Sequence, residues 1–405
     1  MPPKLNLMKS FTLSQWIIII ILSLLTALEP LSIDLYLPAF ISISGAFSTT
    51  LASVQVSLTT FLAGFAIGQL FWGPLADRFG RKKPILFSLL IFILASIASL
   101  YVKTIEHLWV TRFIQALGGC GGVVISRAVV TDYFDKTKTL KIFTLLALIM
   151  SVAPIIAPLL GNVILSVFSW KGIFGTMVIL GFAMFFLTLF FLPETYEKKD
   201  RTRSGSVIAN YFHILKVPQF TVYALIAGIA NGALMVYVGN APYLIMEYGK
   251  LSGNLFSIVF AVNALGLMIA SYLTNFLQKY TTTSRLVQYA LIMMFAASVF
   301  LLVASFMNIS IYALLVMLFL YIFPIGVLFP ATTELAMKPF TDNSGAASAL
   351  FGSLQLLIAF ICMLLSNVIN NNTVLSVGIA FFVCGLAGAF FIFPKIHGKA
   401  ALAKI

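Results

Sequence analysis

Long runs of apolar residues decide what this chain can fold into. Of its 405 residues, 61% are hydrophobic and only 9% are charged, and the apolar positions stand in continuous stretches such as 17–28 and 85–100. A helix needs about 20 such residues to cross a hydrocarbon layer about 30 Å thick. A membrane barrel would instead show segments of about ten residues with alternating polarity. We therefore predict an all-α polytopic membrane protein.

The apolar runs fall into two groups of equal size. We place twelve spans, each to within about three residues, at about 15–40, 52–72, 84–102, 108–130, 139–165, 172–192, 220–246, 253–277, 286–306, 310–335, 343–369 and 373–394. A long hydrophilic stretch, 193–219, separates six from six. We expect an N-terminal half, 1–192, a central cytoplasmic loop, 193–219, and a C-terminal half, 220–405. This is the plan of a duplicated transporter with its substrate site between the halves.

The positive charge marks one side of the membrane. The chain has 25 Lys and Arg against 12 Asp and Glu, and most of the basic residues lie in the even-numbered turns and near the two termini. The odd-numbered turns hold only Lys103, Lys171 and Lys250. By the positive-inside rule, both termini face the cytoplasm. Because the basicity follows this topology, it gives no reason to expect a nucleic-acid partner.

The second part of the central loop has a helical pattern of its own. Its apolar residues are spaced at i, i+1, i+4, i+5 and i+8, namely Val207, Ile208, Tyr211, Phe212 and Leu215. Such a stripe predicts either a short amphipathic helix on the inner membrane surface, in contact with lipids, or a helical linker that packs on the protein.

Three charges lie deep in the predicted spans, where each costs roughly 2.5–3.5 kcal/mol on insertion scales. Glu29 and Asp34 belong to the first span and Arg112 to the fourth. Five residues turn a helix by about 140°, so the two carboxylates need not share a face. Burial favours the protonated form of a carboxyl group, so each could serve proton coupling or substrate binding, or could pair with a cation to lock two helices. Arg112 is the natural partner, either as a modulator of the acids or in a fixed ion pair.

Other polar and bent positions complete the candidate transport path. Pro154, Pro158 and Gly161 in the fifth span predict a kinked helix, which is either merely bent or a pliable seam at an interface that opens. A cavity with aromatic, aliphatic and a few amide groups would suit a large amphipathic molecule, although each residue could instead join helices. The candidate cavity residues are Tyr36, Gln115, Asn231, Tyr237, Asn240, Tyr243, Asn263 and Gln355.

The sequence offers no constellation for covalent or metal chemistry. Cys120, Cys362 and Cys384 all fall inside apolar spans, which argues against a disulfide framework or a metal site. The 3 histidines are dispersed and form no cluster with a nucleophile. We therefore expect a protein that is not an enzyme and needs no cofactor.

The turn after the second span carries the most specific motif. Gly73 to Lys83 reads GPLADRFGRKK and resembles the loop 2–3 signature of the major facilitator superfamily. Arg112 to Gln115 is similar to the fourth-helix motif of that family, and Ala153 to Gly161 is similar to the fifth-helix motif of its antiporters. Three further segments resemble the Bcr/CflA branch of bacterial drug exporters: Ser32 to Pro38, Ser126 to Ala128 and Leu192 to Thr195.

This resemblance implies a function. The chain would be a monomeric drug:proton antiporter that exports hydrophobic or amphipathic compounds by alternating access, driven by the proton gradient. The alternative is a dedicated exporter of a metabolite such as a siderophore, or an importer, with the same fold. Asp34 would bind proton and substrate, with Arg112 as its electrostatic modulator, and Glu29 would favour cationic cargo or add a second proton site.

The resemblance also implies a latch between the two halves. Asp77 would meet the N-terminus of the eleventh span near Asn343, Ser344 and Gly345, where the helix dipole favours a carboxylate. The latch residues would be Gly73, Asp77, Arg78, Gly80, Arg81 and Lys82.

Overall fold

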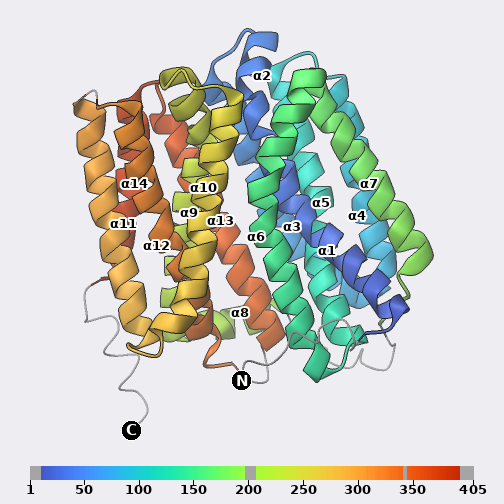
Figure 1. Cartoon of the computed structure of the whole chain (residues 1–405). Coiled ribbons are helices and arrows are strands. Elements are labelled where there is room, and N and C mark those ends of the chain that lie inside the picture. Colours follow the sequence, from blue (N-terminus) through green and yellow to red (C-terminus); the bar gives the residue numbers. More distant parts are fainter. Residues whose placement is uncertain (1–10, 197–206, 308, 341–343, 393–405) are drawn as a thin grey trace.

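The computed structural model describes residues 11–196, 207–307, 309–340 and 344–392, and within these ranges the chain is helical and contains no strand (Figure 1). The long helices are α1 (Leu13–Asp34), α3 (Leu51–Phe79), α4 (Lys82–Leu100), α5 (Ile105–Tyr133), α6 (Lys136–Val167), α7 (Lys171–Phe191), α9 (Pro218–Pro242), α10 (Gly253–Leu277), α11 (Thr283–Phe306), α12 (Ile311–Met337), α13 (Ser344–Ile369) and α14 (Val374–Ala389). Short elements are η2 (Leu37–Ala39), α2 (Phe40–Ala46), α8 (Val207–Leu215) and the π-helical η4 (Tyr243–Tyr248).

The described helices confirm the predicted fold class. Of these, 11 are long and apolar enough to cross a membrane, and α14 is a shorter apolar helix. Several begin at a hydroxyl side chain that accepts a hydrogen bond from the first turn, such as Thr50 before α3 and Ser252 before α10. Such caps satisfy backbone N–H groups that have no partner inside the helix.

The first span differs from its prediction. It does not continue as one helix to residue 40, because α1 ends at Asp34 and the chain then passes through η2 and α2. Tyr36 and Ala39 donate backbone hydrogen bonds to residues three positions earlier, which tightens this stretch around Pro38. As a result, Asp34 lies at the end of a helix rather than inside one.

The helices form two groups that stand side by side (Figure 1). Helices α1 to α7 pack on one another, and α9 to α14 form the second group; the groups meet where α3 contacts α13 and where α6 contacts α10. We call the end of the bundle at which α1 begins the base, which is the lower end in Figure 1, and the opposite end the top. The residue bounds of the halves, 1–192 and 220–405, and the cytoplasmic side of the base stay predictions.

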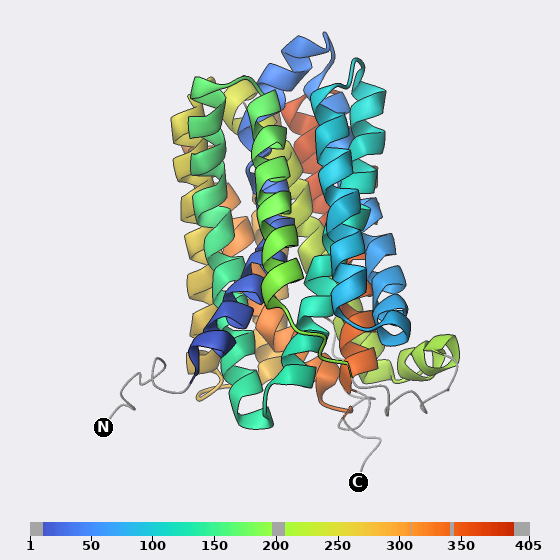
Figure 2. The ribbon, with the colours of Figure 1, turned by 90° about the vertical axis from the view of Figure 1, so that its right-hand side faces the viewer.

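The amphipathic segment of the central loop forms α8, which lies across the base at the edge of the bundle (Figure 2). It contacts α9 and α13. Ile214 is buried, whereas Phe212 is 62% exposed. The helix therefore packs on the protein with one side and presents an apolar ring on another. The charged stretch 197–206 and the side chains of Val207 and Ile208 lie outside the described residues.

Candidate functional site

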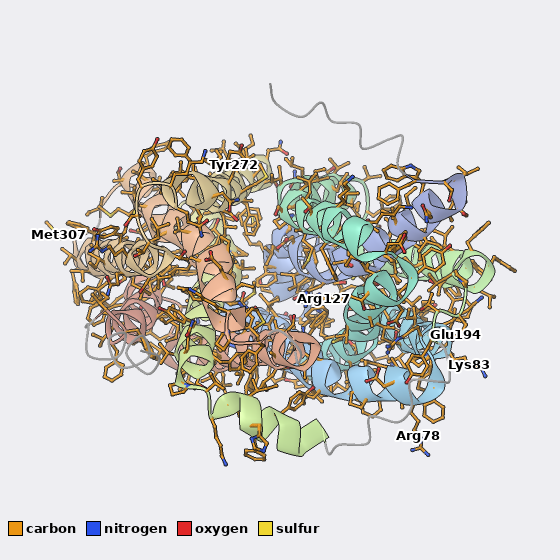
Figure 3. All side chains as sticks on the ribbon, turned by 90° about the horizontal axis from the view of Figure 1, so that it is seen from below. Arg78, Lys83, Arg127, Glu194, Tyr272 and Met307 are labelled. Carbon is orange, nitrogen blue, oxygen red and sulfur yellow. The ribbon has the colours of Figure 1, made fainter. Side chains whose placement is uncertain are left out.

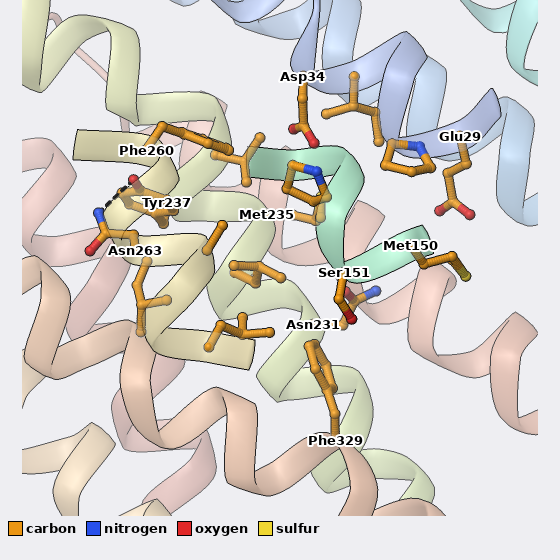
Figure 4. A pocket seen from close by; sticks show the side chains of 18 residues that line it. Glu29, Asp34, Met150, Ser151, Asn231, Met235, Tyr237, Phe260, Asn263 and Phe329 are labelled. Carbon is orange, nitrogen blue, oxygen red and sulfur yellow. Dashed lines mark hydrogen bonds between the residues drawn. The ribbon is translucent and has the colours of Figure 1, made fainter. Parts of the chain in front are cut away.

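A cavity of about 300 Å³ lies between the two groups of helices (Figure 4). Helices α1 and α6 line it on one side, and α9, α10 and α12 line it on the other. Its volume is at the lower end of the range found for small-molecule sites. The cavity thus occupies the place between halves that the duplicated plan predicts.

Glu29 and Asp34 both face this cavity from α1 (Figure 4). Asp34 is only 4% exposed, and Glu29 is half-buried. Within the described part of the chain, neither carboxylate takes part in a hydrogen bond or an ion pair. The structure therefore answers the question of the shared face, because one wall carries both acids. A buried charge without a partner is costly, so these groups are suited to take up a proton or a cationic ligand.

The opposite wall carries aromatic and amide groups. The rings of Tyr237 and Phe260 stack with their centroids 5.6 Å apart. Asn263 donates a hydrogen bond of 2.7 Å to the Tyr237 hydroxyl, and the Asn231 amide donates one of 3.4 Å to the Gln355 carbonyl. Asn231, Tyr237 and Asn263 line the cavity together. Phe260 was not singled out beforehand, because nothing in the sequence separates a cavity phenylalanine from a core one.

Arg112 makes no ion pair with either acid among the described residues, so the fixed ion pair, one of the two alternatives for this residue, is absent from this conformation. Its Nη1 donates to the Gln115 side-chain oxygen at 2.6 Å, and its Nη2 donates to the Ser32 carbonyl at 3.0 Å. The guanidinium carbon lies 4.6 Å from the ring centroid of Tyr36 and 4.3 Å from that of Phe61. Neutral acceptors and aromatic faces replace the ion pair, which is how a fully buried arginine can be accommodated without a carboxylate.

Tyr36 and Gln115 belong to this buried cluster and not to the cavity wall. The Tyr36 hydroxyl shares a hydrogen bond of 2.8 Å with Ser57, and the Gln115 amide donates one of 2.7 Å to Ser96. Both residues are completely buried. The cluster is connected to the acids by α1, because Arg112 binds the carbonyl of Ser32, which belongs to the same helix as Asp34.

The remaining candidates in the second half join helices away from the cavity. Asn240 is completely buried and donates a hydrogen bond of 3.1 Å to Ser366 of α13. Tyr243 opens η4 near the top and donates a hydrogen bond of 2.7 Å to the Asn372 carbonyl. Gln355 accepts at its backbone carbonyl and is not among the lining residues. These contacts match the helix-joining alternative in this conformation.

The proline segment of α6 forms part of the seam between the halves. Pro154 lines the cavity, and the carbonyl of Pro158 accepts a hydrogen bond of 3.0 Å from Ser257 of α10. Gly161 packs directly on the backbone carbonyl of Leu35, where any Cβ atom would clash. Small and bent positions therefore allow α6 to lie close to both α1 and the opposite half.

Neutral hydrogen bonds join the halves at the top. They connect Asn162 to Asn254 at 2.5 Å, Asn367 to Thr59 at 2.6 Å and Asn370 to Gln55 at 3.1 Å. Nearer the base, the corresponding contact among described side chains is Ser353 with Gln69 at 3.5 Å. These residues were not predicted from the sequence, although polar side chains within apolar runs are a signal that could have found them.

The motif around Gly80 makes a sharper turn than predicted. Helix α3 does not end at residue 72 but continues through Pro74 to Phe79. Gly80 has a φ of 89°, which residues with a side chain rarely adopt. Gly73, in contrast, is a helical position with open space around it. Of the two glycines, only Gly80 has a backbone conformation that requires glycine.

Arg81 ties this turn to α5. Its guanidinium binds Asp77 at 2.6 Å and Asp132 at 2.7 Å. Burial alone would lower the pKa of the Arg81 guanidinium, but its bonds to the two carboxylates outweigh burial and raise the pKa. Both partners belong to the first half, so in this conformation Arg81 joins helices of one half rather than the two halves.

The segment after α7 closes the same turn. The Glu194 carboxylate accepts hydrogen bonds from the backbone N–H groups of Arg81, at 2.7 Å, and Lys82, at 3.2 Å. These groups open α4, and a carboxylate at a helix N-terminus is favourable because the N–H groups there lack internal partners. Seen from the base, Glu194 lies beside this turn, and Arg78 points away from the bundle (Figure 3). In the sequence, Glu194 belongs to a segment that resembles the Bcr/CflA branch, and nothing there predicts this contact.

The predicted contact of Asp77 with the eleventh span falls outside the described residues. Asn343 is not described, nor are the side chains of Ser344 and Gly345. The Asp77 side chain is 65% exposed. Burial and, second to it, the charge of Asp77 raise the pKa of the Tyr211 phenol in α8. The latch between halves stays a prediction.

The second half repeats part of this arrangement. Glu334, near the end of α12, accepts hydrogen bonds from Gln278 at 2.5 Å and from Thr283 at 3.2 Å, on either side of the turn between α10 and α11. In the first half, Asp132 near the end of α5 likewise binds a residue of the turn between α3 and α4, which is Arg81. The two turns look unrelated in sequence because amide and hydroxyl donors replace the arginine.

Comparison with known proteins identifies the family. Residues 22–362 match the Major Facilitator Superfamily. The chain belongs to this superfamily. Its members are transporters rather than enzymes, and the described helices agree with a multi-pass protein of the inner membrane.

Relatives within the superfamily match most of the chain. The uncharacterized MFS-type transporter YdgK of Bacillus subtilis is 34% identical over 377 residues, which cover 92% of this chain and 94% of that one. The bicyclomycin resistance protein homolog of Haemophilus influenzae is 27% identical, with 86% and 88% covered. The multidrug resistance protein MdtL of a Shewanella species is 32% identical, with 82% and 83% covered. These similarities confirm the resemblance to the Bcr/CflA branch.

Solved structures share the fold at low sequence identity. A D-xylose-proton symporter superposes with a TM-score of 0.77 at 13% identity, covering 95% of this chain and 99% of that one. A bacterial homolog of the human lysosomal transporter Spinster, inward-facing and unoccupied, gives 0.68 at 16% identity, with 96% and 95% covered. Both show the same superfamily fold.

Proposed function

We propose that the protein is a proton-coupled exporter of hydrophobic or amphipathic small molecules. The observation that carries this proposal is the pair of carboxylates, Glu29 and Asp34, on the wall of a cavity between two halves; among the described residues, neither makes a hydrogen bond or an ion pair. Relatives named for resistance to bicyclomycin and to multiple drugs support the direction of transport.

Asp34 is the proposed exchange site for proton and cargo. It ends α1 and is almost completely buried, so its charge is costly there unless a proton or a ligand neutralises it. A group that holds either the proton or the cargo, but not both, couples their movements. Arg112 is a fixed positive charge behind α1, and we propose it as the electrostatic modulator of this exchange.

The packing supports alternating access. The halves are bonded at the top, and by the positive-inside rule the base faces the cytoplasm, so cargo would enter from the base in this conformation. Opening the top would break the neutral bonds there, with Pro154 and Pro158 as the pliable seam. The proton gradient is the proposed energy source, and the working unit is a monomer among membrane lipids. Among the described residues, no group of acids, cysteines and histidines could hold a metal ion.

The test is Asp34→Asn in inside-out membrane vesicles energised with a proton gradient. We expect uptake of a panel of drugs to fall to background while the amount of protein in the membrane is unchanged. Glu247→Gln, which removes an exposed carboxylate near the top, is the matched control and should keep full uptake. Unchanged proton-driven uptake by Asp34→Asn would overturn the assignment.

A dedicated exporter of one metabolite, such as a siderophore, or an importer, is the second candidate. The small volume of the cavity, about 300 Å³, favours narrow cargo more than a broad range of drugs. The same panel separates the two, because a dedicated transporter would move a single compound class and an importer would load right-side-out vesicles.

A further inference from the structure

Two buried polar groups of opposite halves line the cavity with bonding capacity that is not used (Figure 4). The Asp34 carboxyl group ends α1, and the Tyr237 phenol belongs to α9. Asp34 is 4% exposed and Tyr237 is 2% exposed. The Tyr237 oxygen accepts the bond from Asn263, but among the described residues the phenol proton has no acceptor and the Asp34 carboxyl group has no donor. One half thus offers a donor and the other half an acceptor.

The other polar groups of the wall that faces α1 already donate elsewhere. The Ser151 hydroxyl donates to the Ala147 carbonyl at 2.9 Å, and the Asn231 amide donates to the Gln355 carbonyl at 3.4 Å. The remaining described lining residues of α6, α9, α10 and α12 are apolar, apart from Asn263 and Tyr237. The Tyr237 proton is therefore the hydroxyl donor that this wall keeps unused.

The protonation state of Asp34 decides whether this one donor is sufficient. A neutral carboxylic acid enclosed by apolar groups needs a donor for its carbonyl oxygen, which a single phenol supplies. An ionised carboxylate in the same place needs several donors or a counter-charge. Glu29 on the same wall is itself an acid, and Arg112 is bonded in the cluster behind α1. An emptied cavity that contracts therefore accommodates Asp34 with its proton and rejects the ionised form.

We propose that Tyr237 is the hydrogen-bond partner of protonated Asp34 while the carrier returns without cargo. The phenol keeps its own proton and donates a hydrogen bond to the carbonyl oxygen of the acid, as α1 and α9 approach each other across the emptied cavity. Asp34 takes its proton from water on the side of the top and releases it to water on the side of the base. Cargo in the cavity separates the two groups, so the loaded carrier does not make this bond. This rests on the transport function proposed above, to which it adds the residue of the second half that ties the return step to the proton.

The test uses purified full-length protein in liposomes, with radiolabelled chloramphenicol as the probe. Net uptake driven by a proton gradient needs the return without cargo, whereas one-for-one exchange of labelled for unlabelled probe without a gradient does not. We expect Tyr237→Phe, which keeps the ring, to slow net uptake about tenfold, as for a buried acceptor that loses its donor, and to change exchange less than about twofold. Tyr243→Phe removes a hydroxyl that bonds to the Asn372 carbonyl near the top, and this control should leave the ratio of the two rates unchanged.

The possible results are distinct. If Tyr237→Phe slows net uptake and exchange equally, the hydroxyl acts on cargo or on packing, and the proposal is overturned while proton-coupled transport stands. The proposal is also overturned if neither rate changes, because the hydroxyl is then idle in both steps. Failure of the proposed function is a different result, in which net uptake by the wild-type protein ignores the proton gradient while exchange continues; the return step proposed here would fall with it.

Discussion

Replacing Glu194 by alanine should loosen the N-terminus of α4. The carboxylate accepts bonds of 2.7 Å and 3.2 Å from the N–H groups of Arg81 and Lys82, in an exposed position. Loss of a capping acceptor costs about 1 kcal/mol. Loss of a negative charge at an exposed helix N-terminus costs about 0.5 kcal/mol more. The free energy of local opening should therefore fall by about 1.5 kcal/mol, so that these two amides exchange roughly tenfold faster.

Hydrogen–deuterium exchange with mass spectrometry measures this effect in the peptide that spans the turn. Glu194→Gln keeps an acceptor without the charge, so exchange should rise only about two- to threefold. Glu247→Ala removes an exposed carboxylate elsewhere and should leave this peptide unchanged. If Glu194→Ala exchanges at the wild-type rate, some other group protects these N–H groups, and the capping role is refuted.

The remaining expectations concern the top of the bundle and the residue Asp77. Asn367→Ala removes a hydrogen bond of 2.6 Å between the halves, which costs about 1 kcal/mol and should make the state with an open top about fivefold more accessible. The rate at which an impermeant thiol reagent labels a cysteine placed in the cavity measures this opening. An unchanged labelling rate would contradict the prediction. Asp77→Asn should slow turnover more than it weakens cargo binding, measured in the same liposomes, and lost binding with normal cycling would contradict the latch. The same variant should lower the pKa of Tyr211, which burial and the Asp77 charge raise, as followed by carbon-13 NMR of labelled tyrosine. Because folding raises this pKa, Tyr211 stabilises the folded protein below about pH 10, and this stabilisation is lost as the pH rises through the pKa of Tyr211 in the folded state. In Asp77→Asn, the stability lost over this pH range should be smaller.

Hydrophobicity alone predicted the all-helical membrane fold class and the approximate places of the apolar helices, because a chain in hydrocarbon must bond its backbone within each span. The same reasoning located Glu29 and Asp34, since charges in a span are rare enough to stand out. It failed at residues 73–79, where glycine, proline and charge resemble a loop. There α3 simply continues past the apolar run.

The partners of charged groups were harder to predict than their positions. A fixed ion pair with an acid was one of two alternatives for Arg112, yet Gln115, a backbone carbonyl and two aromatic rings surround it. Arg81 was expected to link the halves, yet Asp132, far along the chain, binds it within one half. Which helices pack against each other depends on contacts between distant segments, and no local sequence pattern in this chain predicts those contacts.

The neutral character of the bonds at the top has a consequence for how the molecule responds to its surroundings. Amide and hydroxyl pairs neither titrate in the physiological range nor respond to ionic screening. These bonds should therefore be nearly insensitive to salt and to acidity. A change in pH on the side of the top should act on the carrier through titratable groups such as the cavity carboxylates Glu29 and Asp34, and not by weakening the uncharged bonds that hold the top closed.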